Sequence, residues 1–133
     1  MNKFGIILGE PNSINSEILG KSKAFKSKAI IIGNYDLLYA QLKILKLNRK
    51  LKKIKKIEDV KKFGKILHVY DVPLKFKNPF FVDPRNTKVY VKKCFDIGHK
   101  FCLQKKLKGI INCPINKKNV LENKIVGITE FLA

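Results

Sequence analysis

The chain has 133 residues, 45% of them hydrophobic and 29% charged, with a formal net charge of +19 at pH 7. This length and composition predict one folded domain with a single core and exclude a disordered chain. No apolar run reaches the roughly 18 residues that cross a bilayer, so we expect no membrane span. The N-terminus lacks the basic cluster and cleavage site of a signal peptide, which favours a cytoplasmic location.

The excess of positive charge has two interpretations. It could be a nucleic-acid footprint, or it could reflect the lysine-, isoleucine- and asparagine-rich composition that an AT-rich genome produces. Arg49 and Arg85 are the only arginines, and the lysines are spread along nearly the whole chain. Because proteins that clamp phosphates favour arginine for its bidentate fork, we favour the second interpretation and do not expect nucleic acid as the partner.

The cysteines and histidines do not form a recognisable metal or redox motif. Cys94, Cys102 and Cys113 are odd in number and contain no CxxC pair, so we interpret them as small apolar residues in a reducing compartment. His68 and His99 have no second ligand at helical spacing, which favours structural roles for both. No metal-binding and no catalytic residue is predicted in this chain.

The first half of the chain predicts two strands that alternate with two helices. Phe4–Leu8 and Ala29–Ile32 are short apolar runs typical of buried strands. Asn15 or Ser16 is predicted to cap a short helix after the first strand, and Asn34 to cap a longer one after the second. The apolar face of the longer helix consists of Leu38, Leu42 and Leu45.

The second half is less regular. Residues 46–62 fit either a basic amphipathic helix, possible on a membrane surface, or a short strand and a helix with solvated charges, and we favour the latter. Ile66–Tyr70 is predicted as a strand, residues 71–86 as a proline-marked loop, and Gly109–Ile111 as the last strand. A long helix precedes that strand, and Gly98 within its apolar stripe indicates close packing against the sheet. The stripe consists of Val91, Cys94, Phe95, Gly98, Phe101 and Cys102.

This order of elements predicts an α/β fold, a sheet with helices on both faces. In such sheets ligands bind beyond the carboxyl ends of the strands. Two loops occupy such positions: Gly9-Glu10-Pro11 after the first strand, and a loop containing Asn116 and Lys117 after the last. Taken alone, the first fits a plain turn, and the second fits a helix cap with a surface lysine as well as it fits a ligand contact.

Four stretches together resemble a known family. They are ILGEPNSINSEIL at 7–19, AIIIGNYDLL at 29–38, NCPINKK at 112–118 and GITEFLA at 127–133. The chain resembles the N-terminal part of 4-hydroxythreonine-4-phosphate dehydrogenase. The Pro-Ile-Asn-Lys and Thr-Glu-Phe-Leu-Ala segments are the specific part of the match, whereas residues 46–86 are supported only by the order of elements.

The resemblance implies a two-domain fold like that of isocitrate and isopropylmalate dehydrogenases. Residues 1–133 would then be an incomplete N-terminal α/β segment, without the second domain and the part that binds metal and NAD. The full-length family is expected to be a homodimer that uses NAD and a divalent metal, held by three histidines further along the chain. Its substrate is a small phosphorylated amino acid, oxidised in pyridoxal phosphate (vitamin B6) biosynthesis.

The same resemblance implies which residues contact substrate. They are Thr129, Asn116 and Lys117, with Gly9 and Glu10 shaping the cleft. Ile128 stands where the family has histidine, and isoleucine cannot hydrogen-bond a substrate. Further departures are Glu10 in place of aspartate, and Ser13 and Asn15 in place of glycines.

Three interpretations of the chain follow. The first is an N-terminal fragment, or a truncated or divergent member, of such a dehydrogenase, and we expect the isolated chain to be inactive. The alternatives are a non-catalytic basic module that binds nucleic acid, and a pseudoenzyme that keeps only the fold.

Overall fold

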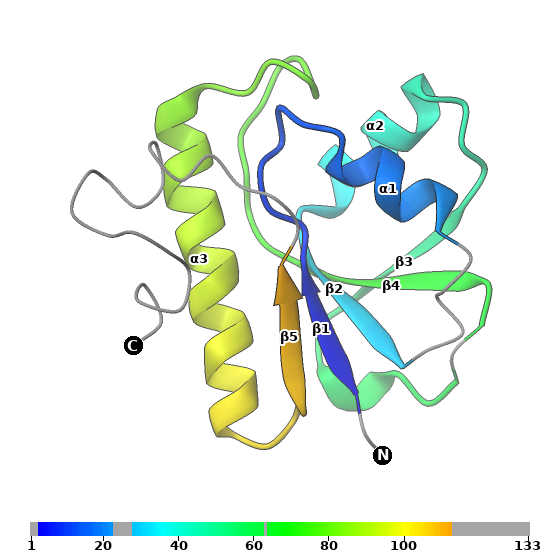
Figure 1. The fold of residues 1–133 in the computed structure, drawn as a ribbon, viewed down its shortest axis with the longest axis vertical. Helices are drawn as coiled ribbons and strands as arrows, with labels where there is room; N and C mark the ends of the chain where they lie inside the picture. The colour runs from blue at the N-terminus through cyan, green and yellow to red at the C-terminus, as the bar shows by residue number, and fades with distance from the viewer. Residues whose placement is uncertain (1–2, 23–27, 63, 113–133) are drawn as a thin grey trace.

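The computed structural model describes residues 3–22, 28–62 and 64–112 (Figure 1). In these residues five strands form one sheet in the order β3-β4-β2-β1-β5, and every pairing is parallel. The elements are β1 (Phe4–Ile7), α1 (Asn15–Lys21), β2 (Ala29–Gly33), α2 (Tyr35–Ile44), β3 (Lys50–Ile54), the 3-10 helix η1 (Ile57–Asp59), β4 (Ile66–Asp71), α3 (Pro84–Leu103) and β5 (Gly109–Asn112).

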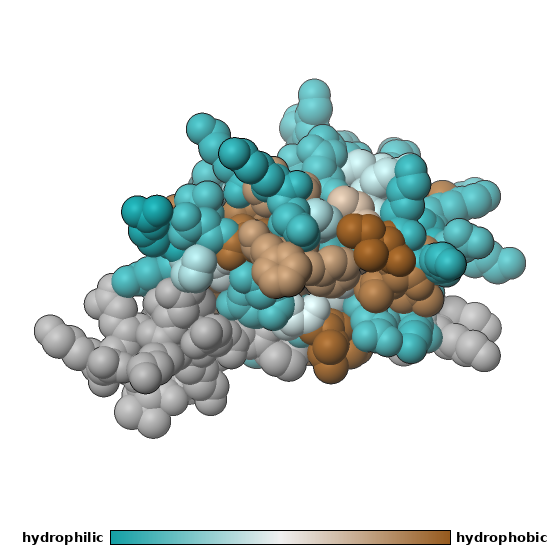
Figure 2. All heavy atoms as spheres, turned by 90° about the horizontal axis from the view of Figure 1, so that it is seen from above, coloured by the Kyte–Doolittle hydropathy of each residue, from teal (hydrophilic) through white to brown (hydrophobic). Residues whose placement is uncertain are grey.

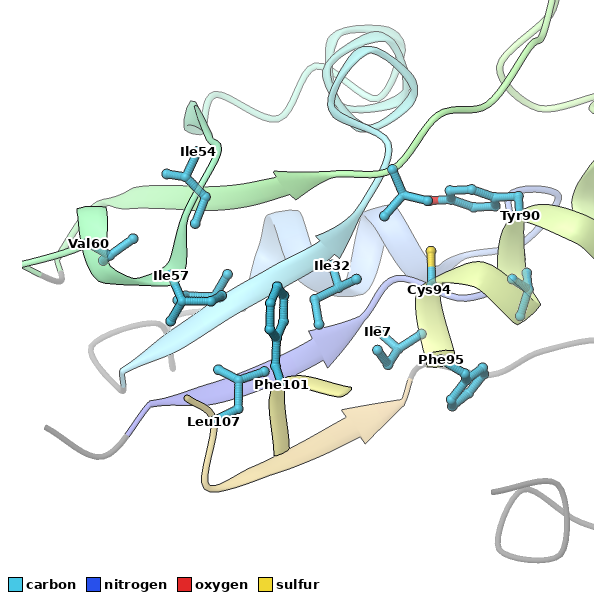
Figure 3. Close-up of a cluster of buried hydrophobic side chains, with 13 residues drawn as sticks. Ile7, Ile32, Ile54, Ile57, Val60, Tyr90, Cys94, Phe95, Phe101 and Leu107 are labelled. Carbon is cyan, nitrogen blue, oxygen red and sulfur yellow. The ribbon is translucent and has the colours of Figure 1, made fainter. Parts of the chain in front are cut away.

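Helices cover both faces of the sheet, which confirms the predicted fold class (Figure 1). The helices α1 and α2 pack on one face, where Leu19, Leu38 and Leu42 meet Ile31 and Val69. The helix α3 and η1 cover the other face through a larger cluster, shown in Figure 3. The buried members of that cluster are Ile7, Ile30, Ile32, Ile54, Ile57, Val60, Val72, Tyr90, Val91, Cys94, Phe95, Phe101 and Leu107.

Two local predictions are confirmed in detail. The side chain of Asn34 caps α2 by accepting a 2.9 Å hydrogen bond from the backbone N–H of Leu37. Gly98 lies against the sheet, and a Cβ there would come within 3.0 Å of the Ile7 side chain. The glycine therefore allows α3 to approach the sheet closely.

The predicted cap of α1 is wrong. Asn15 is the first helical residue, and Ile14 occupies the cap position without a side-chain hydrogen bond. The Asn15 amide instead donates to the carbonyl of Leu8 at 3.0 Å, because it is buried beneath the turn that follows β1. Ser16 is also buried and does not cap the helix.

Two further boundaries differ from the prediction. Residues 46–62 contain the expected short strand, β3, but only the three-residue η1 where a helix was predicted, and they form no amphipathic helix. The loop predicted for 71–86 ends earlier, because α3 begins at Pro84 and Asp83 caps it by accepting a 2.8 Å bond from the N–H of Arg85. Proline suits the first helical position since its missing N–H would have no intrahelical partner there.

The edge strand β3 is strongly basic. Lys50, Lys52 and Lys53 are exposed on it, and charged side chains on an edge strand discourage pairing with another sheet. In the part of the chain that the structure describes, no helix is long and apolar enough to cross a membrane.

The cysteines of α3 are free thiols. Cys94 is fully buried, as the apolar interpretation predicted, and burial raises its pKa to about 12. Cys102 is partly buried, and Cys113 lies outside the described residues.

Candidate substrate-binding edge

The carboxyl ends of the parallel strands lie together along one edge of the sheet, the one that faces upward in Figure 1. Four described connections leave this edge: the turn after β1, the junction between β2 and α2, the segment from β3 to η1, and the long loop between β4 and α3. Polar ligands of open α/β sheets bind at this edge because loop groups converge there. It is therefore the candidate functional site.

The turn after β1 holds two of the predicted site residues, Gly9 and Glu10. Gly9 has φ 78°, a left-handed conformation that glycine adopts without the cost of a Cβ. The Ser13 hydroxyl donates to the carbonyl of Glu10 at 2.5 Å, and the Glu10 carboxylate accepts from the N–H of Asn12 at 3.2 Å. These bonds give the turn a fixed shape, in which Glu10 is partly exposed.

The turn after β1 is also tied to the loop before α3. The Asn12 amide donates to the carbonyl of Val82 at 2.9 Å and accepts from the N–H of Val82 at 2.8 Å. The buried Gln41 of α2 donates to the carbonyls of Pro11 at 2.8 Å and Pro79 at 2.7 Å. The sequence predicts a role for neither Asn12, although it lies in the 7–19 stretch, nor Gln41, because their bonding partners are distant in sequence.

The connections diverge between β2 and β4, because α2 follows β2 on one face and α3 follows β4 on the other. Open α/β sheets bind ligands at such a switch point, but here protein groups occupy it. The Tyr90 hydroxyl accepts a 2.8 Å bond from the N–H of Asn34, and the Asn34 amide donates to the carbonyl of Val72 at 2.9 Å. Burial raises the pKa of Tyr90 well above its usual value, so this hydroxyl stays protonated.

Next to this position, the carboxylate of Asp71 is engaged in contacts within the protein. Its carboxylate accepts from the first N–H of α2, at Tyr35, at 2.8 Å and lies 3.9 Å from the ammonium of Lys53. At the start of α3, hydrogen bonds from the Arg85 N–H and guanidinium lower the pKa of Asp83. With these carboxylates engaged, the position beside β1 and β5 is the part of the edge best suited to a ligand.

The last strand brings a second predicted segment to the same place. Asn112 ends β5 and pairs in register with Ile7, directly before the turn that contains Gly9 and Glu10. The chain therefore leaves β5 next to that turn. The other predicted site residues, Asn116, Lys117, Ile128 and Thr129, lie outside the described residues.

The surface around this edge is mixed. Figure 2 views the molecule from the side on which the strands end and shows apolar atoms among polar ones. Two apolar side chains on the neighbouring loops are strongly exposed, Ile14 at 63% and Phe81 at 80%.

The described residues do not fit a divalent metal or a dinucleotide fingerprint. Among residues 3–22, 28–62 and 64–112, no group of three histidine, cysteine, aspartate or glutamate side chains could hold a metal ion. The sequence has no GxGxxG segment for a pyrophosphate at a strand-to-helix turn.

A parallel sheet covered on both faces, with ordered polar loops at its carboxyl edge, defines an α/β domain. No protein-family model matches the chain. A 4-hydroxythreonine-4-phosphate dehydrogenase of Sulfurihydrogenibium sp. (strain YO3AOP1) is 31% identical over 140 residues, a match that covers 100% of this chain and 42% of that protein. A candidate D-threonate 4-phosphate dehydrogenase of Fusobacterium nucleatum is 27% identical over 143 residues, covering 98% of this chain and 42% of the relative.

The solved structures agree on the fold. The crystal structure of 4-hydroxythreonine-4-phosphate dehydrogenase from Klebsiella pneumoniae superposes with a TM-score of 0.82 at 20% identity, covering 98% of this chain and 43% of that one. The resemblance to 4-hydroxythreonine-4-phosphate dehydrogenase that the motifs indicated is confirmed over the whole chain. The chain spans less than half the length of the curated relatives it matches.

Proposed function

We propose that the chain forms one α/β part of an NAD-dependent oxidoreductase of the 4-hydroxythreonine-4-phosphate dehydrogenase type, acting in pyridoxal phosphate biosynthesis. The observation that carries this proposal is the match along the whole chain to a relative of that name. The ordered turn at Gly9 and Glu10, beside the end of β5, supports it, because a substrate-binding wall needs a fixed backbone at a strand end. The nucleic-acid alternative has no comparable support.

The substrate class follows from the names of the relatives. Both are named for a 4-phosphate of a small hydroxylated acid. In the proposed reaction a secondary alcohol carbon gives a hydride to NAD and the hydroxyl loses its proton, leaving a ketone. Thr129, Asn116 and Lys117 would contact this substrate, with Lys117 supplying a positive charge for the phosphate or carboxylate.

Ile128 and Glu10 distinguish this chain within the proposal. Isoleucine at 128 removes a hydrogen-bond partner, which would weaken substrate binding by about 1–3 kcal/mol if a polar substrate atom faces it. Glu10 has one methylene more than the aspartate of the family, so its carboxylate would reach further into the cleft.

Metal and NAD, which the resemblance implies, would be bound by residues other than the described ones, as would the groups that transfer the proton. We accordingly expect no turnover from the 133-residue chain alone. A homodimer in the cytoplasm belongs to the same proposal.

The test is binding of a 4-phosphorylated hydroxy acid, 4-hydroxythreonine 4-phosphate, to the ¹⁵N-labelled chain. The backbone N–H signals of Gly9, Glu10 and Asn112 should shift in a saturable way. The signal of Leu103, at the C-terminal end of α3 and the opposite edge of the sheet, should not shift. Glu10→Gln is the first variant to compare, with Glu58→Gln on η1 as a matched control for the loss of one carboxylate. Reduction of NAD by the chain alone, or no shift at the strand ends, would contradict the proposal.

A further inference from the structure

A surface hollow lies away from the strand-end site. It has a volume of about 410 Å³ and opens beside the amino-terminal half of β4. The lining reaches His68, three residue steps or roughly 10 Å from Asp71 at the carboxyl end of β4, so the hollow opens toward the opposite end of this strand. Its walls come from β3, η1, the β3–β4 connection and β4: Lys52, Asp59, Lys61, Lys62, Gly64, Lys65, Ile66 and His68.

The lining is strongly positive. It contains four lysines and a single carboxylate, that of Asp59. Within residues 3–22, 28–62 and 64–112, none of these lysines forms an ion pair, although Lys21, Lys53 and Lys106 do so elsewhere on the surface. Lysines spread over a convex surface repel one another weakly in water, whereas lysines around one concavity concentrate a positive potential there.

His68 is the buried polar group of the lining, with 8% of its surface exposed. Burial, and then the charges of Lys52 and Lys3, lower its pKa. The Lys3 ammonium is held nearby, donating to the carbonyl of Ile57 at 2.8 Å. A bound anion would offset these charges, so the imidazole would report directly on occupancy of the hollow.

The backbone at Gly64 adds room. Apart from the adjacent residues of the chain, no described atom lies within 4 Å of where a Cβ of Gly64 would be, so a ligand can approach the main chain at this point. Lysine ammonium groups bind phosphate as point charges, and a hollow of this volume falls in the range of small-ligand pockets.

We propose that this hollow binds a small, multiply charged phosphate anion of the size of pyrophosphate. The site is independent of the proposed dehydrogenase function, because it shares no residue with the carboxyl edge. Its selectivity follows from charge: pyrophosphate should bind more tightly than inorganic phosphate, and binding should weaken as salt is added.

The first experiment titrates the full 133-residue chain with pyrophosphate at low ionic strength and follows both histidines by NMR. The pKa of His68 should rise by about half a unit or more at saturation. The charged groups around it that enter this titration are Lys3, Lys52, Asp59, Lys61, Lys62 and Lys65. His99 on α3 is the internal reference and should not respond. A His68 signal that stays unchanged at millimolar pyrophosphate would overturn the proposal.

Matched variants separate a site from diffuse charge. The pocket variant is Lys61→Gln, Lys62→Gln and Lys65→Gln. The control variant, Lys75→Gln, Lys93→Gln and Lys100→Gln, removes the same charge elsewhere. The pocket variant should lose about tenfold or more in affinity and the control less than about twofold. Dispersed amide NMR spectra check that both variants are folded. Lys52→Gln on β3 tests the loss of a single lysine of the hollow.

Equal losses of affinity in the two variants would mean that pyrophosphate binding depends on net charge only, which contradicts the proposal. An oligonucleotide that competes fully with pyrophosphate, and binds equally to both variants, would also contradict it, since that is the behaviour of a general polyanion surface. Loss confined to the pocket variant supports it.

Discussion

Gln41 offers a direct test of how the strand-end site is held. Its buried amide donates to the carbonyls of Pro11 and Pro79, which belong to two different loops. Gln41→Leu keeps a similar volume and helix propensity but removes both bonds. At about 1 kcal/mol for each hydrogen bond, and more where a buried carbonyl is left unpaired, the free energy of unfolding should fall by about 2–3 kcal/mol.

The assay is urea unfolding followed by circular dichroism, and the dependence of the free energy of unfolding on urea concentration (the m-value) should be the same for all variants. Gln41→Glu should be at least as damaging at neutral pH, because a carboxylate would face two carbonyl oxygens, and it should recover partly in acid as the carboxyl gains a proton. Gln104→Leu, at an exposed position, is the control and should change stability by less than about 0.5 kcal/mol. A Gln41→Leu variant as stable as the parent chain would refute the inference that this residue ties the loops together.

Three further predictions concern single groups. Tyr90→Phe removes the acceptor of the buried Asn34 N–H and should lower the free energy of unfolding by about 1–3 kcal/mol in urea titrations; an unchanged midpoint would contradict the described bond. Gly98→Ala should destabilise the chain by about 1–2 kcal/mol, because overpacking against the sheet outweighs the gain in helix propensity. Gly64→Ala, which has open space around it, should be neutral or slightly stabilising. The reverse order of stabilities would mean that α3 does not approach the sheet so closely. The pKa of His68 is lowered from 6.5 in the folded chain, so the unfolded state takes up the proton more readily. The contribution of His68 to the free energy of unfolding should be full above pH 6.5 and decline as the pH falls below it. In a pH series, His68→Gln should remove that decline.

Local sequence signals predicted much of the fold. The apolar runs at Phe4 and Ala29 predicted two of the three inner strands, Asn34 predicted a helix start, and Gly98 predicted a close helix–sheet contact. Each depends on a residue and its near neighbours in sequence, which is why a pattern of a few residues suffices.

The contacts that shape the site depend on distant residues. Asn12 bonds to Val82 and Asn34 to Tyr90 across more than fifty residues of sequence, and a polar side chain carries no local mark of such a partner. The cap of α1 failed for the same reason: Asn15 resembles a cap, but its amide serves the turn that precedes the helix. The stretch 46–62 was ambiguous because alternating lysine and apolar residues fit both periods, and pairing of β3 with β4 decided the outcome.

The position of β1 has a consequence for how the chain folds. One side of this strand pairs with β2, where Phe4 faces Ala29, but its other side pairs with β5, where Phe4 faces Gly109. The second pairing closes a loop of about a hundred residues, whose entropic cost must be met before its contacts form. During synthesis on the ribosome, one edge of the first strand must therefore stay open until almost all of the described chain has emerged. We expect slow, late docking of β5, and an N-terminal strand with one edge accessible to chaperones until β5 has emerged.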